Sequence, residues 1–325
     1  MRRLADLTVL SVAAWAAARW RFKDRFGALA MLNAWSGWIE AGGLVAAGLT
    51  MWARRYLAGA AGFFAAAGAV AWHAIEWRSP PGAPEAPVDL RLFSLNLLHD
   101  HPSGDAFARL IQRERPDVVL LQELTPSIAC QLLAAVGDDY AYRLLAATSG
   151  SYGFGILSRH PLQEKALLRR PGSRYVQIAT LSVSGRDLDL YNCHLLPPTG
   201  RLFRYLGPTV ATRLREQQIR IVAERIAAAG RPAVVSGDFN LTPWQQAYGM
   251  LVEVLVDSWC EAGSGPGVTW PKYISLLPVP HRTLPLLRLD YCFHTSELLA
   301  RRAHVLYDHT GSDHCALVVD LAWRD

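Results

Sequence analysis

The chain has 325 residues, of which 51% are hydrophobic, and carries a formal net charge of +5 at pH 7, a composition that excludes a disordered protein. Its five cysteines show no CxxC spacing, which argues against a disulfide scaffold and a structural zinc site. Residues 1–88 hold nine Lys or Arg against five Asp or Glu, whereas the remainder holds 24 against 23 and therefore lacks the charge excess of a duplex-binding surface.

The first 78 residues are dominated by two apolar segments. Gly27–Ala53 contains a single charged residue, Glu40, and Leu57–Ile75 contains none. Each has the roughly 20 residues that a helix needs to cross a bilayer. The shorter stretch Leu7–Ala18 fits a third span, part of a hairpin or an interfacial helix. Residues 1–78 are therefore predicted to form a transmembrane helical region with two or three spans.

Residues 79–88 follow as a predicted linker, because four prolines lie between Ser79 and Pro87 and can neither continue a helix nor join a sheet. From residue 89 to 325, short β-type runs alternate with helical segments, which predicts one α/β or α+β domain with sheet packed on sheet. The predicted strands are Asp89–Leu95, Val118–Gln122, Phe154–Leu157, Val176–Ser182, Asp187–Asn192, Ala233–Ser236, Asp290–His294 and Ala316–Leu321. The predicted helices are Gly104–Arg115, Ser127–Val136, Arg213–Ala229 and Trp244–Leu255.

Polar residues recur at the ends of these apolar strands. Buried carboxylates and imidazoles are costly unless they are paired, so their recurrence at strand ends indicates that they converge on one charged site. In chain order they are Asn96, Gln122 with Glu123, Asn192 with His194, Asp238 with Asn240, Asp290, and Asp313 with His314.

This ordered set resembles the motifs of the endonuclease/exonuclease/phosphatase superfamily of Mg2+-dependent phosphoesterases. The matching motifs are the first Asn, Gln-Glu, Asn-x-His-Leu, Gly-Asp-Phe-Asn, Leu-Asp-Tyr and Ser-Asp-His, and they extend over the whole region from about residue 90 to the end. The resemblance implies an α/β (α+β) four-layer sandwich, two packed β-sheets flanked by helices, with the site at one end of the sheets. The N-terminal apolar segments make it similar to a membrane-anchored bacterial branch.

The resemblance also implies roles for these residues. Mg2+, or Mn2+ in its place, would be bound by Glu123 with Asn96 beside it and Asp313 as an outer contributor. Asp238 would orient or deprotonate the attacking water, and Asn240 and Asn192 would donate to phosphate oxygens. His314, positioned by Asp290, would bind phosphate or transfer a proton, and His194 is the second imidazole.

Other residues depart from the pattern or lie outside it. Leu98 stands where the abasic-site endonucleases carry an acidic residue, which argues against that branch and against a second metal ligand there. The remaining histidines show no pattern and are assigned to surfaces or loops: His99, His101, His281, His294, His304 and His309.

Three features favour a lipid or lipid-linked phosphate as substrate. These are the predicted spans, the nearly neutral charge of residues 89–325, and the apolar, proline-broken segment Tyr273–Leu287 before Asp290. The alternative is a membrane-tethered DNase-like nuclease, so nucleic acid stays open as a less favoured partner. A non-catalytic membrane scaffold is the third reading, and no protein partner can be inferred.

The side of the membrane on which the catalytic domain lies depends on the number of spans. Two spans, or three with the N-terminus outside, would keep Arg19, Arg21, Lys23 and Arg25 in the cytoplasm together with the domain, as the positive-inside rule favours. Similarity to membrane-anchored relatives that act on lipid-linked phosphates outside the cell favours the opposite side. We therefore expect an integral protein of the cell membrane with an extracytoplasmic catalytic domain.

Overall fold

The computed structural model describes residues 2–52, 60, 63, 67, 87–100, 103–170, 173–197, 201–271, 273–274, 281–282, 284–308 and 310–324. The chain divides into two compact units, which are treated separately below. One comprises Met1–Arg78, Pro197–Glu216 and Leu241–Gly249, and the other comprises Ser79–Leu196, Gln217–Asn240 and Met250–Asp325.

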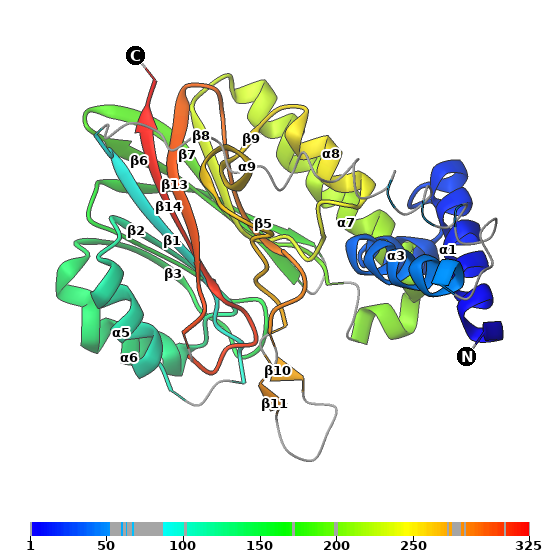
Figure 1. The fold of residues 1–325 in the computed structure, drawn as a ribbon. Coiled ribbons are helices and arrows are strands. Elements are labelled where there is room, and N and C mark those ends of the chain that lie inside the picture. Colours follow the sequence, from blue (N-terminus) through cyan, green and yellow to red (C-terminus); the bar gives the residue numbers. More distant parts are fainter. Residues whose placement is uncertain are drawn as a thin grey trace. The chain divides into compact units, whose positions relative to one another are not determined.

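Two six-stranded sheets form the larger unit within the described residues (Figure 1). The first has the order β13 (Leu298–Leu306), β14 (Ala316–Trp323), β1 (Leu90–Asn96), β2 (Val118–Gln122), β4 (Phe154–Ser158) and β3 (Tyr142–Ala146). The second has the order β5 (Leu162–Arg170), β6 (Ser173–Val183), β7 (Arg186–His194), β8 (Ala233–Asp238), β12 (Asp290–His294) and β9 (Val256–Asp257). A separate pair joins β10 (Tyr273–Ile274) to β11 (His281–Arg282).

Each sheet is mixed, with one parallel pair at its centre. β1 is parallel to β2, and β7 is parallel to β8. The strands beside these pairs, β14 and β4 in one sheet and β6 and β12 in the other, run antiparallel to them. The carboxyl ends of the two parallel pairs therefore meet the amino ends of β12 and β14 at one edge of the sheets.

The main core lies between the sheets. Leu92 and Leu120 from the first sheet share one buried cluster with Leu190 and Val234 from the second. Their alternation along each strand puts every second residue on this inner face. At about 25 cal/mol per Å2 of apolar area, each such fully buried side chain contributes roughly 2 kcal/mol.

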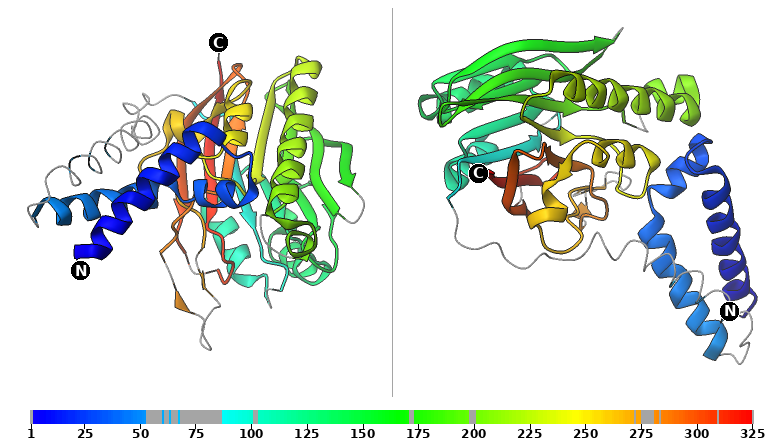
Figure 2. Two further views of the ribbon diagram at one scale, coloured as in Figure 1. Left: turned by 90° about the vertical axis from the view of Figure 1, so that its right-hand side faces the viewer. Right: turned by 90° about the horizontal axis from the view of Figure 1, so that it is seen from above.

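Helices cover the outer faces of both sheets. On the first sheet, α5 (Asp105–Glu114) and α6 (Pro126–Val136) bury Phe107 and Ile128 in a second cluster with Phe93. On the second sheet, the outward-facing Tyr191 of β7 interacts with Arg225 of α7 (Arg201–Ala229). Figure 2 shows the same arrangement from two further directions. The prediction of two packed sheets flanked by helices is confirmed.

The eight predicted strands are all present, with ends that differ by up to three residues. Two predicted helices differ in length. α7 begins at Arg201 rather than Arg213 and is interrupted at Gly207, whose φ of 76° precedes Pro208. α8 (Gln246–Val252) is shorter than predicted, because the chain turns at Thr242–Gln245 before the helix begins. η2 (Gly137–Asp139) and α9 (Ser258–Ala262) complete the unit.

The smaller unit contains α1 (Arg2–Phe22), α2 (Gly27–Asn33) and α3 (Ser36–Trp52). The prediction of one continuous helix over Gly27–Ala53 is wrong, because the segment divides after Asn33. The Asn33 amide accepts a hydrogen bond from Trp15 Nε1 at 3.1 Å and donates to Asp24 Oδ1 at 2.7 Å. Ser36 Oγ then donates to the Asn33 carbonyl at 2.6 Å and fixes the start of α3.

None of the helices in the described residues is both long enough and apolar enough to cross a membrane. Leu7–Ala18 lies inside α1. Most of Leu57–Ile75 and of the predicted linker 79–88 lies outside the described residues, as does much of Tyr273–Leu287. The predicted spans at those positions stay predictions.

Two segments that follow strands of the larger unit in the sequence, Pro197–Glu216 and Leu241–Gly249, belong to the smaller unit. Thr209, on the segment after β7, accepts a hydrogen bond at Oγ1 from the N–H of Gly27 at 3.0 Å. Gln245, on the segment after β8, donates from Nε2 to the Ala30 carbonyl at 3.1 Å. The N-terminal helices are therefore hydrogen-bonded to both of these segments within the smaller unit.

Candidate active site

The polar residues continue the inner-face pattern of the core strands. In β1 the order is Leu92, Ser94, Asn96, and in β8 it is Val234, Ser236, Asp238, so apolar side chains give way to polar ones toward the edge. The strand register pairs Asp238 with both His194 and Asp290. Chain segments far apart in sequence thus deliver their polar groups to one place.

Asp238 lies at the centre of this group and is 1% exposed. Its Oδ1 accepts the N–H of Asn240 at 2.9 Å, and its Oδ2 accepts the Asn240 and Asn96 amides, each at 3.1 Å. The Nε2 atoms of His194 and His314 both lie 3.7 Å from Oδ2. Burial, reinforced by the charge of Asp290, raises the pKa of Asp238 even though both imidazoles oppose the shift.

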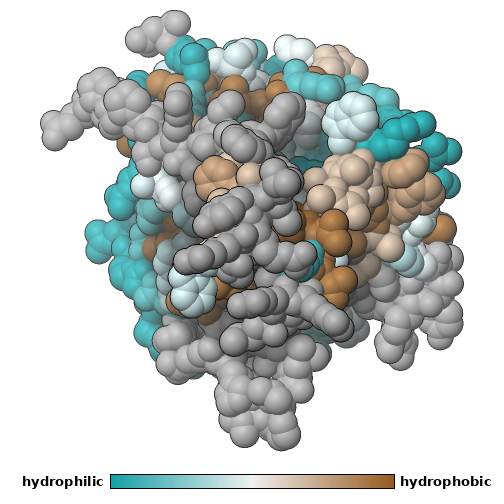
Figure 3. Space-filling model, turned by 45° about the vertical axis from the view of Figure 1, so that its right-hand side comes forward, coloured by the Kyte–Doolittle hydropathy of each residue, from teal (hydrophilic) through white to brown (hydrophobic). Residues whose placement is uncertain are grey.

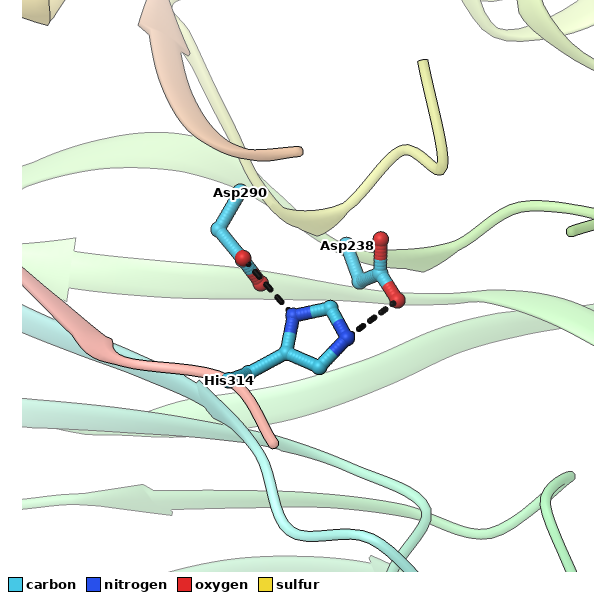
Figure 4. A group of neighbouring side chains, drawn as sticks. All are labelled: Asp238, Asp290 and His314. Carbon is cyan, nitrogen blue, oxygen red and sulfur yellow. Dashed lines mark hydrogen bonds and ion pairs between the residues drawn. The ribbon is translucent and has the colours of Figure 1, made fainter. Parts of the chain in front are cut away.

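The imidazole of His314 lies between two carboxylates (Figure 4). Nδ1 is 2.8 Å from Asp290 Oδ2, which leaves Nε2 facing Asp238. Burial alone would lower the pKa of His314, but Asp290 and Asp238 outweigh it and raise the pKa well above its ordinary value. The two carboxylates therefore favour the protonated form of the ring, with Nδ1 bonded to Asp290 and Nε2 directed toward Asp238. Ser312 fixes the backbone here by accepting the N–H of His314 and donating to the Asn96 carbonyl.

Glu123 forms the other end of the group. Its φ of 57° is in the left-handed region, which costs energy for a residue with a side chain and is typical of functional sites. Oε1 accepts the Asn96 amide at 3.3 Å and lies 3.6 Å from Nε2 of His194. Burial favours the neutral acid, but the charge of His194 and the hydrogen bonds of His99 lower the pKa of Glu123. The carboxylate is thus ionised at neutral pH.

His194 joins the two carboxylates. Its Nδ1 donates to the Ser151 carbonyl at 3.1 Å, so Nε2 is directed toward Glu123 and Asp238. A backbone carbonyl on one ring nitrogen fixes the orientation of the other. The structure thus brings together seven of the residues that the sequence singles out: Asn96, Glu123, His194, Asp238, Asn240, Asp290 and His314.

Two asparagines have amides that are already engaged. Asn192 was predicted to donate to a phosphate oxygen, but its Nδ2 donates across the sheets to the Leu121 and Gly155 carbonyls, each at 3.1 Å. Its Oδ1 accepts from Gln122 Nε2 at 2.8 Å. Asn192 thus ties the sheets together beneath the site. Asn240 lies at the site, where its Nδ2 donates to Asp238 and to the Leu195 carbonyl instead of facing outward.

Asp313 and two other histidines have partners that the sequence does not predict. Asp313, predicted as an outer metal contributor, accepts a hydrogen bond from Trp270 Nε1 at 3.0 Å. His99, predicted as a surface or loop group, does lie in a loop, but its Nδ1 is 2.6 Å from Glu123 Oε2 at the site. The same prediction is wrong for His294, which is buried in β12 with Nε2 2.9 Å from Glu261 Oε2. The sequence feature that could have identified His99 as a site residue is its position three residues after Asn96, in the loop that follows β1.

The donor atoms present fit a divalent cation. Glu123 offers an ionised carboxylate, the ligand type that Mg2+ and Mn2+ prefer. Asn96 directs its amide nitrogen toward both carboxylates, so it bridges them rather than presenting its oxygen. Ligand atoms of Asp238, Asp290 and His314 also lie within 4.8 Å of one another. All three of these residues are buried, whereas the Glu123 side chain is 12% exposed, which makes Glu123 the better centre.

The glycine before Asp238 is required by the close approach of β7. Gly237 has a φ of 138°, and a Cβ there would overlap the backbone of Cys193. Gly237→Ala is therefore expected to lower the free energy of unfolding by about 3 kcal/mol, combining backbone strain with overpacking. Denaturant titration measures this. Gly249→Ala, in helix α8 with open space around it, should have no cost, and equal stability of the two variants would contradict the prediction.

Residues 93–314 match the model of the Endonuclease/Exonuclease/phosphatase family, and this range contains every site residue described above. The chain belongs to this family. Members of the endonuclease/exonuclease/phosphatase family are typically metal-dependent phosphoester hydrolases. Among proteins with curated functions, none matches the chain.

Solved structures resemble the fold of this family member. An endonuclease/exonuclease/phosphatase from Bacteroides vulgatus is 19% identical with a TM-score of 0.58, and the alignment covers 73% of this chain and 100% of that one. One from Beutenbergia cavernae is 24% identical (TM-score 0.56), with 73% and 72% covered. D. rerio TDP2, solved with a single strand DNA product, is 21% identical (TM-score 0.57), with 72% and 98% covered.

Proposed function

We propose that this protein hydrolyses phosphate esters or anhydrides with the help of a divalent cation, Mg2+ or Mn2+. The observation that carries the proposal is the continuous series of alternating carboxylates and imidazoles at the sheet edge: Asp290, His314, Asp238, His194 and Glu123. Neighbouring members of this series lie 2.8–3.7 Å apart. Such a series places proton acceptors, proton donors and a cation ligand around one point.

The two titrating groups at the centre suit opposite tasks. Asp238, held by Asn240 and Asn96, orients the attacking water and accepts its proton, and its raised pKa brings it closer to neutrality, where a general base works best. His314, kept protonated by Asp290, donates a hydrogen bond to a phosphate oxygen or a proton to the leaving group. A cation at Glu123 would neutralise charge that develops on the phosphate oxygens.

The proposed substrate is a lipid or lipid-linked phosphate. Its support comes from the smaller unit, where large apolar side chains of α1 and α3 are exposed: Leu10 (66%), Trp20 (84%), Val45 (66%), Leu49 (52%) and Trp52 (85%). Apolar residues also reach the surface on the side of the molecule turned forward in Figure 3. Exposed apolar residues beside basic ones such as Arg21 are typical of segments that contact a membrane.

A nuclease is the second candidate. Its support is the likeness to D. rerio TDP2, which was solved with a single strand DNA product. The nearly neutral charge of residues 89–325 weighs against it, since contacts with a nucleic-acid backbone depend on Lys and Arg.

The test uses the solubilised full-length protein with Mg2+ and three substrates in parallel: a polyprenyl diphosphate, a single-stranded oligonucleotide and a supercoiled plasmid. We expect phosphate release from the lipid by the wild type and none by Asp238→Asn. Cleavage of DNA alone would support the nuclease instead. Turnover of none of the three by a folded protein would contradict phosphoester hydrolysis as the function.

The location of the protein in the cell is a separate part of the proposal. We propose a protein of the cell membrane, anchored through residues 1–78, with the catalytic residues outside the cytoplasm. Two reporters fused after Asp325, one active only in the cytoplasm and one active only outside it, test this. Activity of the cytoplasmic reporter alone would overturn the proposed side.

A further inference from the structure

His99 is held against Glu123 by two contacts. Its Nδ1 lies 2.6 Å from Glu123 Oε2, and its own N–H donates to the same oxygen at 3.0 Å. The backbone bond fixes the loop and holds the Cα of His99 beside Glu123, so the ring is attached close to the carboxylate. Neither the sequence motifs nor the proton transfers proposed above give this imidazole a task.

The geometry around Glu123 is compatible with two adjacent ligands of one ion. In octahedral coordination with bonds near 2.1 Å, neighbouring ligand atoms lie about 3 Å apart, close to the 2.6 Å between Nδ1 and Oε2. Both groups remain accessible, because the His99 side chain is 32% exposed and that of Glu123 is 12% exposed. An ion could therefore reach both atoms from solvent.

The second ring nitrogen supplies an independent observation. His99 Nε2 lies 3.4 Å from Oδ1 of Asp100. Histidines that bind metals almost always direct their other ring N–H to a carboxylate, a backbone carbonyl or water, which orients the ring and raises its basicity. Asp100, His99 and Glu123 thus reproduce the order carboxylate, imidazole, ligand site.

We propose that His99 is a metal ligand together with Glu123, and that this imidazole shifts the preference of the site from Mg2+ toward Mn2+ and the later first-row divalent ions. Mg2+ strongly favours oxygen ligands, whereas imidazole binds transition ions better. This inference rests on one part of the proposed function, which is the binding of a cation at Glu123. The competing explanation is that His99 merely hydrogen-bonds to Glu123 and never contacts the ion.

Mn2+ binding distinguishes these explanations without an activity assay. In the full-length protein loaded with Mn2+, electron spin-echo envelope modulation detects 14N coupling from a directly bound imidazole. We expect this coupling in the wild type and its loss in His99→Gln. Because His194 also lies near Glu123, His194→Gln must retain the coupling, and so must His304→Gln, a histidine on β13 that pairs with Glu114.

Calorimetric affinities give the second readout. His99→Gln should weaken Mn2+ binding about tenfold or more while changing Mg2+ affinity less than about threefold. Asp100→Asn should weaken Mn2+ binding but retain the 14N coupling, since Asp100 acts only through His99. Glu123→Gln should weaken binding of both ions.

Each other outcome has a defined meaning. Coupling that persists in His99→Gln and disappears in His194→Gln would overturn the proposal in favour of His194. Mn2+ binding that depends on Glu123 but shows no 14N coupling would leave His99 as a hydrogen-bond partner and would also overturn it. Failure of the wild type to bind Mn2+ or Mg2+ would overturn both this proposal and the cation site of the proposed function.

Discussion

Asp238→Asn is expected to lower kcat by about a thousandfold, the size of effect that a general base in this position contributes. The amide has nearly the same shape as the carboxylate and can still contact Asn240, but it cannot accept a proton from water. Steady-state kinetics on whichever substrate is turned over measures this. KM should change much less than kcat, because the proton is transferred only on the way to the transition state.

The same substitution should change the stability of the protein only slightly. Burial and the neighbouring Asp290 raise the pKa of Asp238, so its ionised form is less favourable in the folded than in the unfolded chain. A carboxyl whose pKa is raised by folding reduces stability once pH exceeds its unfolded value, and an amide removes that cost. The amide also removes a charge that stabilises the His314 imidazolium, so the two effects oppose each other and we expect only a small change in Tm for Asp238→Asn at neutral pH.

Asp189→Asn is the matched control for this prediction. Asp189 is a buried aspartate on β7 whose carboxylate pairs with Lys165 Nζ at 2.7 Å, away from the motif residues. Its substitution should leave kcat unchanged and lower Tm through the loss of the ion pair. Comparable loss of kcat in both aspartate variants would contradict the assignment of Asp238 as the base.

The strands that could be predicted are the ones that carry the site. β1, β2, β7 and β8 have nearly continuous apolar runs, because both of their faces are buried. The longer strands that the sequence does not predict, β3, β5 and β13, all lie at sheet edges. Edge strands carry charges and bulges that break the pattern, such as Glu164-Lys165 in β5 and Arg301-Arg302 in β13.

The site was predictable as a set of residues but not in the contacts of each one. Residues two apart on a strand share a face, so the convergence of Asn96 and Asp238 follows from the pattern. The side-chain hydrogen bonds of Asn192 depend on the distance between the sheets, which no local pattern encodes. His99 was missed because a loop residue has no periodicity, and its direction is set by a backbone bond to Glu123.

In the N-terminal segment, the sequence predicts a continuous helix that the structure divides in two. Hydropathy over Gly27–Ala53 predicts one long helix, yet Asn33 ends α2 by bonding to Trp15 and Asp24. A single polar residue in an apolar run carries little weight in an average over about 20 residues. Its effect arises from partners elsewhere in the unit, so only the folded arrangement reveals it.

Asp290→Asn is expected to lower kcat about a hundredfold and to shift the alkaline limb of the pH–rate profile to lower pH. In the wild type, Asp290 and Asp238 hold the pKa of His314 well above 6.5, despite the opposing effect of burial. Activity that needs protonated His314 therefore falls only as pH rises through that raised value. Loss of the Asp290 charge lowers the pKa of His314, and the decline begins earlier.

The pH dependence of Tm gives an independent check on the raised pKa of His314. Because the pKa of His314 is higher in the folded than in the unfolded chain, its contribution to stability is fully present below about 6.5 and is lost as pH rises through the folded value. Tm of the wild type should therefore fall over this window, and Asp290→Asn should show a weaker fall.

His314→Gln should show the largest loss of kcat and the largest change in the pH–rate profile that this pair of residues can cause. This variant should lose about a thousandfold in kcat and should show no alkaline limb from this group. If Asp290→Asn instead lowered kcat without moving the limb, Asp290 would act only on the orientation of the ring, and the limb would belong to another group. A profile identical to that of the wild type in both variants would contradict the role of the His314–Asp290 pair in proton donation.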